Sequence, residues 1–320
     1  MRALLFDGSA VRFKSHHADP TPAPDEALIH VLAAGICQTD LEIAKGYLNF
    51  KGILGHEFVG TVTACRDDRW LGKRVVGEIN CVCSKCAMCQ RGLSTHCLNR
   101  TVLGIAGRDG AFADFLTLPI RNLHTLPDHV TNEEAVFVEP LAAAFQILRQ
   151  VPIDSRTRVT ILGDGRLGQL CAQVIARTKC PLLLVGRHAA KLAVADRRGI
   201  ATTLDSDLVA RRDQDVIVDC TGRAEGLTRA LALVRPRGTI VLKTTVAAAK
   251  PLNLAPIVID EITLLGSRCG PFPDAINALA ARQIDVSGLI SRRLRLDAAE
   301  PVFRDGVSPD VLKVLLTFDR

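Results

Sequence analysis

The pattern of hydrophobic and polar residues changes near residue 141 and predicts two kinds of structure along the chain. Before residue 141 the apolar runs are short and bounded by turn residues, which is typical of β-strands. The strands expected there are Ala27–Leu32, Phe58–Thr63, Arg74–Val76 and Ala111–Leu118. Between residues 81 and 99 the chain has little periodicity and many cysteines. The first part is therefore predicted to be rich in β-structure, with one irregular lobe.

After residue 141, segments with helical spacing alternate with short apolar runs. The expected helices are Leu141–Val151, Leu167–Thr178, Ala189–Arg198 and Gly226–Val234. The expected strands are Arg158–Leu162, Leu182–Val185, Val216–Cys220, Thr239–Lys243 and Ile262–Gly266. This alternation predicts βαβ units and an α/β fold with a parallel sheet. We expect one domain over residues 1–140, a second over 141–269, and a return of 270–320 to the first.

Composition narrows the class of protein. The chain has 320 residues, 48% of them hydrophobic and 23% charged, which favours two folded domains over disorder. The net charge is only +6 and aromatic residues make up 4%, so we expect no nucleic acid partner. No apolar stretch is long enough to span a membrane, and Asp7 comes too early for a secretory signal. A cytoplasmic location is expected, where the 11 cysteines stay reduced and favour metal binding over disulfides.

Four cysteines in the irregular lobe have the spacing of a metal site: Cys83, Cys86, Cys89 and Cys97. Four thiolates at such short spacings can surround one tetrahedral zinc ion, and a site closed by four cysteines is structural. An iron–sulfur cluster is the alternative metal. Cys81 and His96 are further candidates as ligands, although the spacing favours the four cysteines.

A glycine-rich turn directly follows the strand expected at 158–162. Gly163, Gly165 and Gly168 form a G-x-G-x-x-G motif between a predicted strand and a predicted helix. Gly163 allows the tight turn, Gly165 lets the backbone approach a pyrophosphate, and Gly168 permits close packing of helix on strand. Arg166 and Leu167 begin the helix, whose free N–H groups favour an anion. An ordinary glycine turn is the alternative.

The end of the next strand favours NADP over NAD. NAD-binding units usually carry an acidic residue there, which binds the ribose 2′-hydroxyl. Here the strand is followed by Gly186 and Arg187. The glycine leaves space for a 2′-phosphate, and Arg187 and Lys191 can bind it. The alternative is that both cations are only solvated.

A third group of residues is dispersed along the first part of the chain. Its members are Cys37-Gln38-Thr39-Asp40, Gly55-His56-Glu57 and Glu139-Pro140-Leu141. Each segment is weak evidence alone. Together they supply a thiolate, an imidazole and carboxylates, which suit a zinc site with an open position.

The order of these motifs resembles that of the zinc-dependent medium-chain alcohol dehydrogenases over essentially the whole chain. Glu139-Pro140-Leu141 makes the chain most similar to the polyol, sorbitol, threonine and glucose dehydrogenase branch. The resemblance implies a GroES-like, β-rich catalytic domain, a Rossmann domain with a doubly wound parallel sheet, and an active-site cleft between them.

The resemblance implies a role for each residue that matches a motif. Cys37 and His56 would be ligands of the catalytic zinc, and Glu57 would be a ligand or lie just behind the metal. Glu139 would bind the zinc directly or through water. Thr39 would bond the substrate hydroxyl, and Asp40 would orient the imidazole of His56.

The chain departs from the family pattern at the end of the proton relay. Many relatives have histidine where this chain has Glu42, so the relay could use Glu42 or water, or be absent. A shortened loop around 65–70 affects the expected pocket shape and oligomer contacts. The resemblance also places Thr221 and Arg268 near the cofactor.

The expected function is hydride transfer between NAD(P) and a secondary alcohol, polyol or sugar, or the corresponding carbonyl. Zinc would acidify the alcohol, Thr39 would pass on its proton, and the nicotinamide would take the hydride. We expect two zinc ions per chain and a homodimer or homotetramer. The alternatives are a catalytically silent NADPH-binding or regulatory protein on the same scaffold and a quinone or enoyl reductase. Such reductases generally lack the Cys37 and His56 pair.

Overall fold

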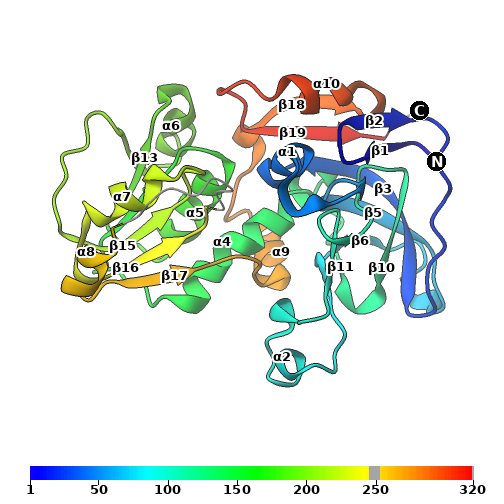
Figure 1. Ribbon diagram of the computed structural model, residues 1–320, viewed down its shortest axis with the longest axis horizontal. Coiled ribbons are helices and arrows are strands. Elements are labelled where there is room, and N and C mark those ends of the chain that lie inside the picture. Colours follow the sequence, from blue (N-terminus) through cyan, green and yellow to red (C-terminus); the bar gives the residue numbers. More distant parts are fainter. Residues whose placement is uncertain (245–252, 319–320) are drawn as a thin grey trace. The chain divides into compact units, whose positions relative to one another are not determined.

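The computed structural model of the chain describes residues 1–244 and 253–318. The chain divides into two compact units (Figure 1). Unit 1 comprises Met1–Glu139 and Ala275–Arg320, and unit 2 comprises Pro140–Asp274. Within the described ranges, no helix is long and apolar enough to cross a membrane.

Unit 1 is built mainly on antiparallel β-structure, with parallel pairs at β18–β19 and β8–β9. Its largest sheet has the order β11-β6-β5-β3-β19-β18, and β10 also pairs with β3. Their bounds are β3 (Glu26–Ile36), β5 (Glu57–Ala64), β6 (Arg74–Gly77), β10 (Phe115–Pro119), β11 (Leu123–Thr125), β18 (Ile290–Arg295) and β19 (Lys313–Thr317). The long strand β3 pairs with β5 on one side and with β19, from the end of the chain, on the other. A C-terminal strand therefore completes the sheet begun by N-terminal ones.

Two smaller sheets and short helices complete this unit. One sheet has the order β2-β1-β4, with β1 (Ala3–Phe6), β2 (Val11–Lys14) and β4 (Gly52–Ile53). The other contains β7 (Asn80–Cys81), β8 (Thr101–Leu103) and β9 (Gly107–Arg108). The helices are α1 (Gln38–Ala44), α2 (Ala87–Gln90), α3 (Asn132–Ala135) and α10 (Glu300–Asp305). Short 3-10 turns lie at Tyr47–Asn49, Asp68–Trp70, Ser94–His96, Ile120–Asn122, Ser287–Leu289 and Leu296–Ala298.

Unit 2 has the alternating structure that the sequence predicts. Its strands are β12 (Val159–Leu162), β13 (Leu182–Gly186), β14 (Ala201–Leu204), β15 (Gln214–Asp219), β16 (Val234–Leu242) and β17 (Thr263–Gly266). They form one parallel sheet in the order β14-β13-β12-β15-β16-β17. Numbered along this unit, that order is 3-2-1-4-5-6, the order of dinucleotide-binding sheets.

Helices cross between these strands. They are α5 (Arg166–Ala176), α6 (Ala189–Asp196), α7 (Glu225–Leu231) and α8 (Ala255–Ile259). Two further helices, α4 (Val138–Gln150) and α9 (Phe272–Ala280), contain the points where the chain passes from one unit to the other. The α/β fold class is confirmed. Strand β14 was not expected, because its four residues include two polar threonines and leave almost no periodic signal.

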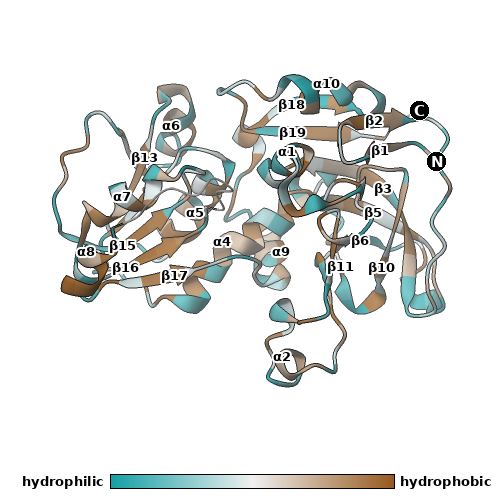
Figure 2. Cartoon of the chain, viewed as in Figure 1, coloured by the Kyte–Doolittle hydropathy of each residue, from teal (hydrophilic) through white to brown (hydrophobic). Residues whose placement is uncertain are grey.

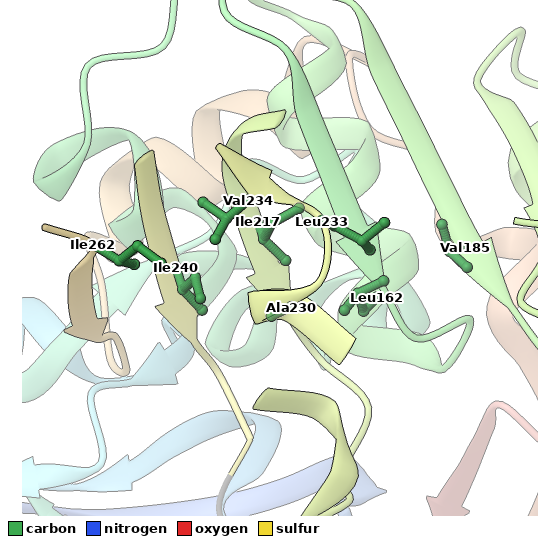
Figure 3. Packing of buried hydrophobic residues seen from close by; sticks show 8 residues of the cluster. All are labelled: Leu162, Val185, Ile217, Ala230, Leu233, Val234, Ile240 and Ile262. Atoms are coloured by element: carbon green, nitrogen blue, oxygen red, sulfur yellow. The ribbon is translucent and has the colours of Figure 1, made fainter. Parts of the chain in front are cut away.

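The core of unit 2 packs where the inner strands meet a helix. Leu162, Ile217, Ile240 and Ile262 come from the strands or their ends, and Ala230 comes from α7 (Figure 3). Figure 2 shows the matching hydrophobic colour along β15 and β16. Because the inner strands are covered by other elements, they carry continuous apolar runs. The carboxyl ends of β12, β13 and β15 remain available for polar residues.

Candidate active site and metal centres

Cys37, His56 and Glu57 converge in unit 1. Cys37 lies between the end of β3 and the start of α1, while Glu57 begins β5 and pairs with Gly35 of β3. One ligand atom of each residue, a thiol sulfur, an imidazole nitrogen or a carboxylate oxygen, lies within 4.8 Å of those of the other two. His56 and Glu57 are buried, whereas Cys37 is partly exposed. This donor set suits a zinc ion with an accessible side.

Asp40 links the first two members of this cluster. Its Oδ2 accepts a hydrogen bond of 2.7 Å from the Cys37 backbone N–H, which caps α1, and its Oδ1 lies 3.0 Å from His56 Nδ1. Burial would lower the pKa of His56, but the charge and hydrogen bond of Asp40, together with Cys37, hold it well above its ordinary value. Because Nδ1 faces Asp40, Nε2 is the nitrogen left for a metal.

Lys313 holds one oxygen of Glu57. This lysine is fully buried on β19, and its Nζ forms an ion pair with Glu57 Oε2. Its Nζ also lies 5.5 Å from the ring centre of Phe137. Burial lowers the pKa of Lys313 to about 8, although the charges of Cys37 and Asp40 oppose this. Glycine is required at position 35, because a Cβ there would press on Glu57, Lys313 and Val136.

The other carboxylate oxygen of Glu57 supplies the fit test for a metal. Oε1 is buried and has no hydrogen-bond partner in the part of the chain that the structure describes. An unpaired buried carboxylate oxygen is costly, and a cation beside it would remove that cost. The buried orphan oxygen next to a thiol and an imidazole therefore fits a divalent ion.

Of the other residues expected near this cluster, Thr39 lies beside Cys37, whereas Glu42 and Glu139 have other surroundings. Thr39 Oγ1 is 3.8 Å from Cys37 Sγ. Glu42 accepts a hydrogen bond from Gln38 and pairs with Lys45 at 3.2 Å on the surface of α1. Glu139 lies in the first turn of α4, and its carboxylate is outside the group of three ligand atoms. The structure thus brings Cys37, Thr39, Asp40, His56 and Glu57 together. Glu42 pairs with Gln38 and Lys45 instead, and the Glu139 carboxylate is not within 4.8 Å of all three ligand atoms.

The four cysteines of the lobe form a second cluster. The lobe, which carries α2, projects from the sheets of unit 1 (Figure 1). Cys86 Sγ lies 3.6 Å from Cys89 Sγ and 3.8 Å from Cys97 Sγ, and Cys97 Sγ lies 3.5 Å from Cys83 Sγ. A tetrahedron with zinc–sulfur bonds of about 2.3 Å has edges of about 3.8 Å. The four sulfurs therefore match one zinc ion.

The thiol pKa values show how crowded this cluster is. A hydrogen bond from the Lys85 backbone lowers the pKa of Cys83 to about 6. Burial, with hydrogen bonds to Cys86 and Cys97, raises the pKa of Cys89 to about 12. Four thiolates cannot share this space without a compensating cation.

The glycine turn of unit 2 has the geometry of a phosphate-binding loop. Gly163 has φ +113°, and a Cβ on Gly168 would collide with the carbonyl oxygen of Gly163. Nothing lies within 4 Å of the position of a Cβ on Gly165, so this face of the loop is open. Arg166 and Leu167 begin α5, which directs its free N–H groups to the same place.

The end of β13 lies beside this loop. Gly186 is the last residue of β13, and Arg187 follows it as an exposed side chain. In the described ranges, neither the guanidinium of Arg187 nor the ammonium of Lys191 forms a hydrogen bond or ion pair. Thr221 donates its N–H and Oγ1 hydrogen to Asp219 after β15, and Arg268 lies just beyond β17 beside Cys269.

Sequence reasoning missed two charged residues of these sites, Lys313 and Asp164. Lys313 is the single charge in the apolar segment 311–318, which was the available signal. Asp164 occupies the first variable position of the glycine motif. Its carboxylate accepts hydrogen bonds of 2.7 Å from the backbone N–H groups of Arg187 and His188. A carboxylate thus does reach the end of β13, from the glycine loop rather than from the strand.

Two family models and several relatives match this chain. The model for the alcohol dehydrogenase GroES-like domain matches residues 23–128, and that for zinc-binding dehydrogenases matches residues 167–283. A 2-dehydro-3-deoxy-L-galactonate 5-dehydrogenase of Pseudoalteromonas atlantica is 30% identical over 84% of each chain. A sorbitol dehydrogenase of Halalkalibacterium halodurans is 26% identical over 93% of each chain.

A solved structure is similar over almost the whole length. It is a Sinorhizobium meliloti 1021 protein described as a zinc-binding dehydrogenase and bound to NADP, with a TM-score of 0.89, 29% identity and 99% of both chains covered. The family models, the relatives and the fold therefore agree over most of the chain. The chain belongs to the zinc-dependent medium-chain alcohol dehydrogenase family and is an NAD(P)-linked alcohol or polyol dehydrogenase.

Proposed function

We propose that this dehydrogenase interconverts a secondary alcohol, polyol or sugar and its carbonyl, using zinc at Cys37, His56 and Glu57 and preferring NADP. The observation that carries the proposal is the convergence of these three donors around the unpartnered Glu57 Oε1. When bound, zinc supplies a Lewis acid that acidifies a hydroxyl or polarises a carbonyl, and the nicotinamide supplies or accepts hydride.

The protein's own residues hold the reacting groups and the proton. Asp40 fixes the imidazole of His56 through Nδ1, and Lys313 holds the carboxylate of Glu57 in an ion pair. Thr39, one step into α1 from Cys37, is proposed to bond the substrate hydroxyl and pass its proton on. Glu42 lies one turn further along α1 and is exposed enough to hand a proton to water.

The polyol branch is proposed from Glu139 and from a relative's name. Because the carboxylate of Glu139 lies outside the cluster of three ligand atoms, we assign it a contact with the metal through water. The sorbitol dehydrogenase among the relatives supports a polyol as substrate.

A second zinc ion is proposed for the cysteine lobe. The distances between the sulfurs of Cys83, Cys86, Cys89 and Cys97 support it. Two zinc ions per chain would then be bound, one catalytic and one structural. Because the lobe needs reduced thiols to bind metal, we place the protein in a reducing compartment such as the cytoplasm.

The preference for NADP is proposed from the charges after β13. In the described ranges, the side chains of Arg187 and Lys191 form no hydrogen bond or ion pair, and the chain has a glycine rather than an acidic residue at position 186. The space beside Gly186 is filled by Asp164, so Arg187 and Lys191 alone support binding of a phosphate. The similar Sinorhizobium meliloti structure is bound to NADP, which supports the same assignment. Thr221 and Arg268 are proposed as further contacts of the coenzyme, since both follow strands of the coenzyme-binding sheet.

A homodimer is proposed from the free edge of the sheet in unit 2. Strand β17 has no strand partner on its outer side among residues 1–244 and 253–318. Beside it, α8 exposes Val258 and Ile259 to 75% and 76%, and Figure 2 shows this helix as strongly hydrophobic. Exposed edges invite pairing with another strand, and a two-fold axis would pair β17 with its own copy.

The test is loss of activity when the cluster is broken. We expect Cys37→Ala and His56→Ala to lower kcat by about 10³-fold or more, because a Lewis acid contributes several kcal/mol to the barrier. Activity would be measured by nicotinamide absorbance in a screen of polyols, sugars and secondary alcohols with NADP and NAD. Zinc analysis should fall from two ions per chain to one.

Cys65→Ser is the matched control, because this thiol lies in unit 1 outside both clusters. It should keep both activity and zinc. NADPH binding, measured by fluorescence, should survive in the Cys37 and His56 variants. Near-native activity in either of those variants would overturn the assignment of the catalytic metal.

A further inference from the structure

A carboxylate from the glycine loop occupies the corner where the sheet would receive the adenosine end of a coenzyme. Asp164 is 7% exposed and belongs to the loop after β12, whose last residue pairs with Val185 of β13. The loop after β12 and the end of β13 therefore lie side by side at the carboxyl edge of the sheet. Asp164 reaches across this gap.

One oxygen of Asp164 holds the turn between β13 and α6. Oδ2 accepts the N–H groups of Arg187 and His188, each at 2.7 Å, and His188 Nδ1 lies 3.0 Å from the same oxygen. Hydrogen bonds to an ionised carboxylate are stronger than those between neutral groups. The backbone that carries Arg187 is therefore fixed to the phosphate-binding loop.

Gly186 leaves the space that the side chain of Asp164 occupies. A Cβ on Gly186 would collide with Cβ, Cγ and Oδ2 of Asp164, so an acidic side chain cannot stand at this strand end while Asp164 is present. The usual NAD arrangement, an acid at the end of the second strand, is thus replaced by an acid from the loop. The difference is that Oδ2 of this acid already accepts two backbone N–H groups and lies beside His188 Nδ1.

The consequence concerns charge. Asp164 is only 7% exposed and its Oδ2 is occupied by the turn after β13, so little of this carboxylate is left to receive a ribose hydroxyl. Asp164 also has His188 as its partner, so Arg187 and Lys191 keep their charges free for another anion. We propose that Asp164 is a positioning residue that makes the enzyme selective for NADP(H), by fixing the turn from which Arg187 binds the 2′-phosphate. This inference rests on the NADP preference proposed above.

The test compares affinities for NADPH and NADH, measured by fluorescence titration of the holoenzyme. Asp164→Ala should lower the affinity for NADPH at least about tenfold more than that for NADH, since a charge-assisted anchor is lost. Asp164→Asn keeps an oxygen acceptor and should restore part of this selectivity. A merely structural role would weaken both coenzymes equally.

A double-mutant cycle with Arg187→Ala checks that Asp164 acts through Arg187. The two effects on NADPH should not add, so the double variant should bind NADPH about as weakly as Arg187→Ala alone. Additive effects, or an unchanged ratio of NADPH to NADH affinity in Asp164→Ala, would overturn the inference. Thermal unfolding identifies variants that fail to fold. If Asp164→Ala fails to fold, His188→Ala provides the second measurement, because it removes only the imidazole contact with Asp164. This variant should lower the ratio of NADPH to NADH affinity, and an unchanged ratio would count against the proposal.

Asp154→Ala is the matched control, because this exposed carboxylate precedes β12 at the opposite edge of the sheet and contacts only its own loop. It should leave the ratio unchanged. A wild-type enzyme without preference for NADPH would refute the proposed coenzyme and remove the basis of this inference. A selective wild-type enzyme with a selective Asp164→Ala variant would refute the role of Asp164 alone.

Discussion

Lys313 is a charged side chain without any exposed surface, and it touches a proposed metal ligand. A buried ion pair gains little over an apolar pair, but removing one partner leaves an uncompensated charge in the interior. Lys313 therefore makes the carboxylate of Glu57 tolerable in the folded protein. The cluster with Cys37 and His56 depends on this cation even though Lys313 is not itself a proposed ligand of the metal.

We expect Lys313→Met to lower the free energy of unfolding by about 3 kcal/mol, because Glu57 is left buried without its partner. The Glu57→Gln, Lys313→Met double variant should regain much of this loss. Urea unfolding of the wild type, Lys313→Met, Glu57→Gln and the double variant measures the coupling between the two residues. Lys45→Met, at an exposed pair with Glu42, is the control and should change stability by about 0.5 kcal/mol or less. Additive effects at positions 57 and 313 would show that the pair is not coupled.

At the scale of elements, the cysteine lobe has almost no core of its own. Its helix α2 has four residues, far fewer than an isolated helix needs, and Leu93 and Leu98 are exposed. Cys97 is its buried ligand candidate. The sulfur cluster takes the place of the apolar core, so metal binding and folding of the lobe are one process.

Cys97→Ser should therefore remove one zinc ion per chain and leave residues 81–99 open to proteolysis. The measurement is zinc analysis with limited trypsin digestion and mass spectrometry of the fragments. Cys180→Ser, a buried thiol of unit 2 outside both clusters, should show neither change. A variant at position 97 that keeps two zinc ions and a protected lobe would contradict the four-cysteine site.

Elements with local signals were predictable from the sequence, and those built by distant pairing were not. The strand–glycine–helix unit at 159–176 and the four cysteines each lie within a short segment, so their spacing carried the information. Strand β19 pairs with β3, although most of the chain separates the two strands in sequence. Nothing in residues 313–317 indicates that partner. The contact between Lys313 and Glu57 depends on that pairing and stayed hidden for the same reason. Asp164 was overlooked because its hydrogen bonds depend on how β12 and β13 align.

At the scale of the whole molecule, the proposed homodimer depends on the free edge of β17. The order of the parallel sheet leaves β14 and β17 at its two ends. The apolar residues of α8 accompany the β17 end. An apolar surface next to unpaired backbone groups is a self-association site unless it is protected by charge.

Ile259→Lys should shift the protein from dimer to monomer, because it places a charge in the proposed interface and leaves the core untouched. Light scattering after size-exclusion chromatography measures the mass. Val209→Lys, an equally exposed apolar position beyond β14, is the control and should not change it. A dimer that survives Ile259→Lys and Leu264→Lys together would place the interface elsewhere.

The return of the C-terminal strand to unit 1 has a consequence for protein synthesis. Unit 2 is continuous in the chain and can fold as soon as the ribosome has released it. The sheet of unit 1 must wait, because Lys313 is made 256 residues after Glu57. Until then the growing polypeptide carries Glu57 beside Cys37 and His56 without its cation. The proposed ligand Glu57 is thus made early, but it gains its partner cation only after the C-terminal strand has been made.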